Sequence, residues 1–172
     1  RLTIPKLIVN ATGDTFWVPD SAQFYYNDLP SPRYLRYLPN ADHTLGGTSE
    51  AIADLSAWLT DISAGLTLPD VTWTIDRGTI TVEVDTNDLT PPLRANLWRA
   101  TSPYRDFRYD EDLNPNTPQW APTVLLPRQQ GGYKAEVPPP QLGWTGFFVE
   151  LVFSPTGAKT LTTEVSVVPD FY

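Results

Sequence analysis

The sequence predicts a mixed fold, with an α/β portion over residues 1–67 and an all-β portion over residues 68–172. Two observations lead to this prediction. In the first portion, apolar residues form an unbroken run or recur at helical spacing, which is typical of a parallel sheet with helices on its faces. In the second portion, apolar and polar residues alternate between turns rich in proline and glycine, which is typical of antiparallel strands.

The α/β portion is expected to begin with strand, helix and strand. The run LTIPKLIV over residues 2–9 is almost continuously apolar, as in a strand buried on both faces of a parallel sheet. Pro19 and Asp20 are expected to open a helix, because Asp20 is a good N-cap and Gln23 lies three residues on, as in a capping box. Residues 33–38 (RYLRYL) are expected to form the second strand.

A longer helix is expected after the second strand, capped by Thr48 or Ser49. Gly65 supplies its stop, and residues 66–69 are the expected linker to the all-β portion. The apolar residues of this helix recur at spacings of three and four and predict a core-facing stripe. They are Ile52, Leu55, Leu59 and Ile62.

These elements are expected to belong to a larger sheet. Two strands and two helices cannot cover both faces of a run such as residues 2–9, and a two-stranded sheet is only marginally stable in water. The chain also begins at Arg1, without methionine, a charged leader region or an apolar leader segment. We therefore expect the remaining strands of the sheet to lie upstream of Arg1.

The all-β portion contains eight segments that are expected to form short strands. Eight such strands over about a hundred residues predict an immunoglobulin-like β-sandwich. The segments are residues 71–75, 80–84, 93–98, 105–109, 120–126, 133–137, 146–153 and 160–167. Most of the aromatic residues here occupy core positions of the alternation. Trp98 and Phe148 have the opposite parity, so we expect them to meet the α/β portion rather than to form a sugar-binding platform.

Two side chains at the ends of the predicted parallel strands could act together. Asp14 follows the first strand and His43 follows the second, so both are expected at the carboxyl edge of the sheet, where α/β folds place their ligands. In α/β-hydrolases the triad acid and the triad histidine follow successive late strands in this order. In that scheme Asp14 orients the imidazole, and His43 acts first as general base and then as general acid.

Each of these residues also has an ordinary explanation. A Gly-Asp pair after a strand is usually a turn in which the aspartate bonds its own backbone, and a single loop histidine is more often only a polar surface residue. Asp42, beside His43, is a rival partner for the imidazole. The order, sheet edge and spacing of Asp14 and His43 favour the catalytic pair.

The nucleophile of such a triad is absent from this sequence. No serine lies in a G-x-S-x-G motif, and Ser49 follows the histidine at the start of a helix. By chain order the nucleophile is expected upstream of Arg1, so this chain alone is expected to be inactive.

The composition argues against several other functions. A net charge of −8 does not suit the binding of a nucleic-acid backbone, and no apolar run approaches the ~18 residues of a membrane span. With one histidine and no cysteine, neither a transition-metal site nor any other cofactor is expected. A calcium site around Asp106, Asp110, Glu111 and Asp112 is a weaker interpretation than a solvated acidic loop. The glycosylation sequon at residues 10–12 ends a buried strand and is interpreted as accidental.

Five strings of this sequence, taken together and in order, resemble the PhoPQ-activated pathogenicity-related proteins. They are PKLIVNATGD (5–14), YLRYLPNADH (34–43), RDFR (105–108), GWTGFF (143–148) and TTEVSVVPD (162–170). The resemblance covers essentially the whole chain. It implies a secreted or periplasmic protein with an α/β-hydrolase domain, similar to prolyl-oligopeptidase-type serine hydrolases, followed by a β-sandwich.

The resemblance also implies roles for residues and for a missing portion. Asp14 and His43 match the acid and histidine positions of the family, whereas the serine and the oxyanion hole belong to an N-terminal portion, held in the same protein or as an associated chain. The family is associated with virulence and with resistance to antimicrobial peptides. The leading hypothesis is that the substrate of the parent protein is a peptide or a small ester. The alternative hypothesis is a non-catalytic binding or signalling protein on a hydrolase scaffold.

Overall fold

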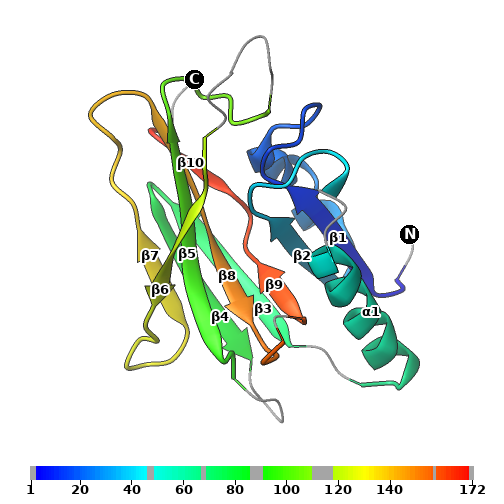
Figure 1. Ribbon diagram of the computed structural model, residues 1–172. Helices are drawn as coiled ribbons and strands as arrows, with labels where there is room; N and C mark the ends of the chain where they lie inside the picture. The colour runs from blue at the N-terminus through cyan, green and yellow to red at the C-terminus, as the bar shows by residue number, and fades with distance from the viewer. Residues whose placement is uncertain are drawn as a thin grey trace.

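The computed structural model describes residues 3–45, 49–66, 69–85, 91–109, 118–156 and 158–170. Within these ranges the protein is rich in β-structure, with a two-stranded parallel sheet and two antiparallel sheets (Figure 1). No helix in the described residues is long and apolar enough to cross a membrane.

The parallel sheet consists of β1 (Lys6–Ala11) and β2 (Arg33–Leu38), paired from Lys6 opposite Arg33 to Ala11 opposite Leu38. The prediction of a strand over residues 33–38 is confirmed. The first strand begins at Lys6 instead of residue 2, where the Lys6 N–H donates to the Pro32 carbonyl at 3.2 Å. Pro5, just before it, has no N–H to offer a sheet, which accounts for the later start.

The segment between these strands forms two short 3-10 helices, η1 (Pro19–Phe24) and η2 (Tyr26–Asp28), in place of the expected α-helix. The expectation that Asp20 caps this helix is wrong, because the N-cap residue is Val18 and makes no side-chain cap bond. Asp20 is instead buried in the first turn, where its carboxylate accepts hydrogen bonds from Gln23 and from Arg105, at 3.1 and 2.9 Å. The ion pair with Arg105 thus holds the side chain that would otherwise cap the helix.

Helix α1 (Ser49–Ser63) forms where the periodicity predicts a helix, and Gly65 supplies its stop as expected. Gly65 has a φ of 68°, a conformation that glycine adopts at little cost. Its N–H donates to the Ile62 carbonyl and that of Leu66 to the Asp61 carbonyl, the two bonds of a Schellman motif. The suggested cap Thr48 lies outside the described residues.

The face that α1 buries is not the apolar stripe that the sequence predicts. Ile52, Leu55 and Leu59 are 65, 45 and 49% exposed. The buried side chains of the helix are Asp54 and Asp61. Both acids are drawn inward by cations from other elements. Asp54 accepts a hydrogen bond from the buried Arg36 of β2, and Asp61 accepts one from Lys159 at 2.9 Å.

The antiparallel sheets contain eight strands in the described part of the chain. Their order is β10-β8-β5-β6, with β9 beside β8, in one sheet and β3-β4-β7 in the other. The strands are β3 (Asp70–Asp76), β4 (Thr79–Asp85), β5 (Arg94–Ser102), β6 (Ala121–Leu125), β7 (Tyr133–Glu136), β8 (Trp144–Val152), β9 (Thr160–Thr162) and β10 (Ser166–Val168).

Two of the strand predictions are wrong. Residues 105–109 are not a strand, because Asp106 bonds the backbone and the guanidinium of Arg108, and the Tyr109 N–H donates to the Gly13 carbonyl. The expected strand over residues 160–167 is divided into β9 and β10. At the break, the Thr163 hydroxyl accepts the Val149 N–H in place of a backbone carbonyl, so the regular ladder stops.

The five-stranded sheet is covered on both faces (Figure 1). Alternate residues of β8 point to opposite sides. Val149 packs with Ile80 of the three-stranded sheet, whereas Phe148 packs with Tyr37 of β2, their ring centroids 5.9 Å apart. Trp98 stacks on Phe148 at 6.4 Å and packs against the same cluster. The prediction that Phe148 meets the α/β portion is confirmed, and Trp98 joins the same cluster through Phe148.

A buried guanidinium joins three of these elements. Arg36 of β2 is fully buried and pairs with Glu50 and Asp54 of α1 and with Glu150 of β8. It also donates to the Tyr37 carbonyl at 2.7 Å. A buried cation requires such partners, because the desolvation of an unpaired charge is very costly.

Candidate functional site

The loop after β1 carries Asp14 to the carboxyl edge of the parallel sheet. The Thr12 N–H donates to the Leu38 carbonyl at 3.1 Å, and the Gly13 N–H donates to the Ala41 carbonyl at 2.9 Å, so the strand pairing continues into the loop. A side chain at position 13 would place its Cβ only 3.0 Å from the Ala41 oxygen. Glycine at this position therefore lets the two loops lie in contact.

The loop after β2 carries His43 to the same edge. Its turn is built on Asn40, which has a φ of 59°, a left-handed conformation that asparagine tolerates better than most residues. The Asn40 N–H donates to the Thr12 hydroxyl at 2.8 Å. The Asn40 side chain exchanges two hydrogen bonds with the Trp120 backbone, at 2.7 and 3.0 Å. Asn40 and Thr12 thus position the site, although neither stands out in the sequence. The signal that could have found them is that each lies within three residues of His43 or Asp14.

Asp14 and His43 contact each other directly. The Nδ1 atom of His43 lies 2.9 Å from Oδ2 of Asp14, within hydrogen-bond distance. The side chain of His43 is half-exposed, and that of Asp14 is 14% exposed. The ring of Phe16 meets the imidazole edge-on, with the centroids 4.7 Å apart. The structure thus brings together the two residues that the sequence selected.

The environment of Asp14 favours its ionised form. Partial burial opposes ionisation, but the hydrogen bond with His43 and those from the Phe16 and Trp17 N–H groups outweigh it, so the pKa of Asp14 lies below its usual value. The two N–H groups donate to Oδ1, at 2.8 and 3.2 Å, which leaves Oδ2 for the imidazole. A charged Asp14 can orient His43 and can stabilise its imidazolium form.

The N-terminal part of the chain matches a known family. A model of the PhoPQ-activated pathogenicity-related proteins matches residues 1–108, which include both Asp14 and His43. The chain belongs to this family.

A relative of this PhoPQ-related chain is the autocrine proliferation repressor protein A of Dictyostelium discoideum. The two sequences are 28% identical over 193 residues. The match covers 99% of the present chain but 39% of the relative, so the chain spans well under half of that protein.

Asp42, the rival partner for the imidazole in this PhoPQ-related chain, takes part in its own turn. Its Oδ1 accepts hydrogen bonds from the backbone N–H and the hydroxyl of Thr44, at 2.9 and 2.6 Å. Asp14 therefore remains the better candidate to orient His43.

The glycosylation sequon of this PhoPQ-related chain is not presented to solvent. Thr12 is fully buried, and the Asn10 side-chain amide donates to the Tyr25 hydroxyl at 3.0 Å. Of the suggested calcium ligands, Asp106 binds Arg108 and residues 110–112 lie outside the described ranges. The described residues contain no group of three or more side chains that could hold a metal ion.

A cavity of about 600 Å³ lies beside Asp14. Its wall is largely apolar and comes from the loop after β1, from η1 and the residue that follows it, and from both parallel strands. The lining residues include Trp17, Val18, Phe24, Tyr25 and Tyr37. Trp17 and Phe24 are 66 and 69% exposed. An apolar surface of this kind next to Asp14 can hold an apolar ligand group or an apolar side chain of another protein segment.

Proposed function

We propose that this chain supplies the acid and the base of an exported serine hydrolase of the α/β-hydrolase type, which cleaves peptide or ester bonds. The observation that supports the proposal is the hydrogen bond between His43 and Asp14 at the carboxyl ends of adjacent parallel strands. Membership of the PhoPQ-related family and the chain order, acid before histidine, agree with it. Export and a role in virulence are part of the proposal through that membership alone.

In this proposal His43 transfers the protons. Because Nδ1 faces Asp14, the other ring nitrogen, Nε2, is the atom that takes the proton from a serine hydroxyl as the hydroxyl attacks the carbonyl carbon. Asp14 stabilises the resulting imidazolium. His43 then returns the proton to the leaving amine or alcohol, and water repeats the sequence on the acyl-enzyme. The serine and the oxyanion hole belong to a segment outside this chain.

Two surfaces of the chain suit such a segment. In the described part of the chain, β1 pairs with β2 on one side and with no strand on the other. Three residues of the apolar stripe of α1, Ile52, Leu55 and Leu59, are also exposed. We propose that further strands of an α/β-hydrolase sheet pair with β1 and that the stripe packs against that unit. The length of the amoebal relative leaves room for such a segment. The antiparallel sheets are then an immunoglobulin-like β-sandwich of residues 68–172, attached to a hydrolase domain that ends near residue 67.

The proposal is tested on the complete protein with p-nitrophenyl esters and peptide p-nitroanilides. His43→Ala is expected to abolish hydrolysis. Asp14→Asn is expected to lower kcat by a factor on the order of 10⁴, because an asparagine partner favours the wrong imidazole tautomer. Asp42→Asn removes a charge of the same sign beside His43 and is the matched control, with an expected change of less than about threefold, since Asp42 sits in its own turn. Normal hydrolysis by His43→Ala would disprove the proposal.

A second candidate function is a signalling or binding role without catalysis. It is favoured by the name of the amoebal relative, which describes a repressor of proliferation. A serine-directed fluorophosphonate probe separates the two functions in the complete protein. Covalent labelling that is lost in His43→Ala supports the hydrolase, whereas the absence of labelling and of hydrolysis supports the non-catalytic role.

A further inference from the structure

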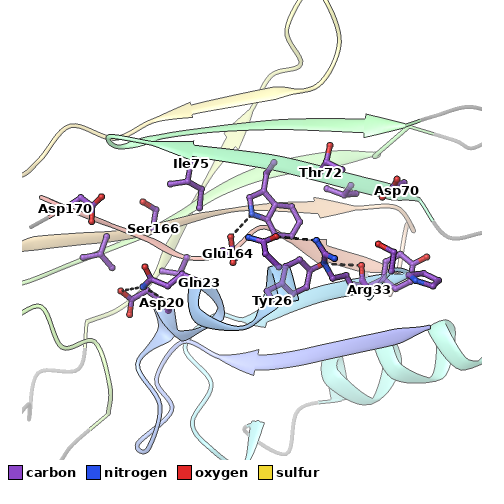
Figure 2. Close-up of a pocket in the computed structure, with 18 of the residues that line it drawn as sticks. Asp20, Gln23, Tyr26, Arg33, Asp70, Thr72, Ile75, Glu164, Ser166 and Asp170 are labelled. Atoms are coloured by element: carbon purple, nitrogen blue, oxygen red, sulfur yellow. Dashed lines mark hydrogen bonds between the residues drawn. The ribbon is translucent and has the colours of Figure 1, made fainter. Parts of the chain in front are cut away.

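A second cavity, of about 900 Å³, lies between the α/β portion and the antiparallel sheets (Figure 2). The 3-10 helices and the start of β2 form one wall, and β3 and the residues leading into β10 form the other. Neither Asp14 nor His43 lines this cavity, so it is separate from the candidate catalytic pair.

Two aromatic rings meet across the cavity, one from each wall. The rings of Tyr26 and Trp73 are stacked, with the centroids 5.2 Å apart and an interplanar angle of 25°. The Trp73 indole N–H donates to Oε2 of Glu164 at 3.0 Å, which fixes the orientation of the indole (Figure 2). The stacked rings and this carboxylate are thus in contact with one another in the cavity wall.

Glu164 is the feature that points to a ligand. Its side chain lines the cavity although the residue is only 6% exposed, and its second oxygen, Oε1, has no hydrogen-bond donor within the described residues. A buried carboxylate oxygen without a donor is costly, because it has lost its water without a replacement. The Glu164 carboxylate is therefore incompletely compensated at the cavity wall, and a cation bound in the cavity would offset its charge.

The charges around the cavity favour a positively charged ligand. Four carboxylates and two guanidinium groups line it. One guanidinium, that of Arg105, is paired with Asp20 at 2.9 Å, and the other, that of Arg33, donates to the Leu29 carbonyl at 2.6 Å. Apart from Asp20, which pairs with Arg105, the carboxylates that line the cavity are Asp70, Glu164 and Asp170. The wall therefore carries an excess of negative charge.

The aromatic unit is suited to a cation as well. The guanidinium carbon of Arg33 already lies over the ring of Tyr26, 5.0 Å from its centroid, in a cation–π contact. Burial raises the pKa of Tyr26 to about 12, with the Glu164 charge adding to the effect, so the phenol is neutral at physiological pH. The indole of Trp73 next to it offers the strongest aromatic partner for a second cation.

We propose that this cavity is a binding site for an organic cation, an ammonium or guanidinium group carried on a short alkyl chain. The cationic group pairs with the Glu164 carboxylate, and the alkyl chain lies along the indole of Trp73. A neutral polyol could occupy the cavity but could not offset the excess of negative charge. The volume of the cavity is in the range of small-molecule sites.

The test uses the complete protein labelled with 5-fluorotryptophan and observed by ¹⁹F NMR. The Trp73 signal is the one that disappears in Trp73→Phe. Agmatine is the probe, and 1,4-butanediol is its neutral counterpart. Agmatine is expected to shift the Trp73 signal in a saturable manner at concentrations where the diol does not. Glu164→Gln is expected to raise the Kd for agmatine at least tenfold, as for the loss of a charge-assisted hydrogen bond.

Asp170→Asn is the matched control, because it removes the same charge from an exposed residue of the same cavity. It is expected to raise the Kd less than threefold. If Glu164→Gln lowers the thermal unfolding midpoint, Glu164→Asp takes its place, since it keeps the charge but withdraws the carboxylate by one methylene, and it is also expected to raise the Kd about tenfold. The proposal is overturned by a diol effect equal to that of agmatine, by no saturable shift, or by equal effects at positions 164 and 170.

Discussion

Replacing Arg36 by methionine is expected to remove a large part of the stability of this protein. Arg36 is fully buried, and its guanidinium pairs with Asp54 at 2.8 Å and with Glu150 at 3.2 Å, as well as with the half-exposed Glu50. Methionine has a similar length and fills much of the same space, so the substitution mainly removes charge and hydrogen bonds.

The size of the loss follows from the two carboxylates that stay buried. Asp54 and Glu150 are 3 and 4% exposed. Asp54 keeps the Thr160 N–H and Glu150 keeps the Asn96 amide, each on the oxygen that does not face Arg36. The other oxygen of each loses its donor. Breaking a buried pair on one side costs about 3–5 kcal/mol. Because the free energy of unfolding of natural proteins is about 5–15 kcal/mol, such a loss is easily measured.

Urea unfolding followed by far-ultraviolet circular dichroism gives the free energies of unfolding. Arg36→Met, Asp54→Asn and Glu150→Gln are combined in a triple variant, which removes the cation and both buried charges and is expected to recover at least half of the loss. Arg77→Met is the matched control, because Arg77 is almost fully exposed beside Asp76 and is expected to have no resolvable effect. A loss below about 1 kcal/mol for Arg36→Met, or no recovery in the triple variant, would refute the reasoning.

Two further predictions concern the packing of β8 and the charge of Asp14. Phe148→Ala is expected to lower the free energy of unfolding by about 3–5 kcal/mol, because Phe148 is fully buried, whereas Leu126→Ala at an 80% exposed position should change it little in the same urea experiment. Asp14→Asn should destabilise the protein at pH 7. Because the pKa of Asp14 is lowered on folding, the stabilisation is present above its unfolded value of about 4 and is lost as the pH falls through the folded value. Urea unfolding at pH 7 and pH 3 checks this: the difference between wild type and variant is expected to be smaller at pH 3, and an equal difference at the two pH values would contradict the prediction.

Local patterns in the sequence predicted most elements but not which face of each is buried. The strand at residues 33–38 and the helix at residues 49–63 were predicted because apolar spacing and the glycine stop are local signals. The prediction of the buried face of that helix was wrong, because the face that is buried depends on ion pairs with Arg36 and Lys159, which are distant in the sequence. Residues 105–109 alternate like a strand, yet their partner is the loop after β1.

The candidate catalytic pair was predictable for a similar reason. Asp14 and His43 each follow a strand, and parallel strands bring their carboxyl ends to one edge, so the local pattern together with one topological rule is sufficient. The cavity around Glu164 was not predictable in this way. Its walls come from four separate parts of the chain, residues 20–34, residues 70–75, Arg105 and residues 164–170, and no spacing rule relates them.

The antiparallel part of the chain also holds the two loops of the candidate site in place. The loop after β2 is fixed through Asn40, which exchanges two hydrogen bonds with the Trp120 backbone. The loop after β1 is fixed through Gly13, whose carbonyl accepts the Tyr109 N–H at 3.3 Å. Trp120 is itself buried against Phe148, with the ring centroids 5.4 Å apart. The packing of β8 therefore reaches the site through Trp120, and a catalytic use of the pair would require both parts of the chain to be folded together.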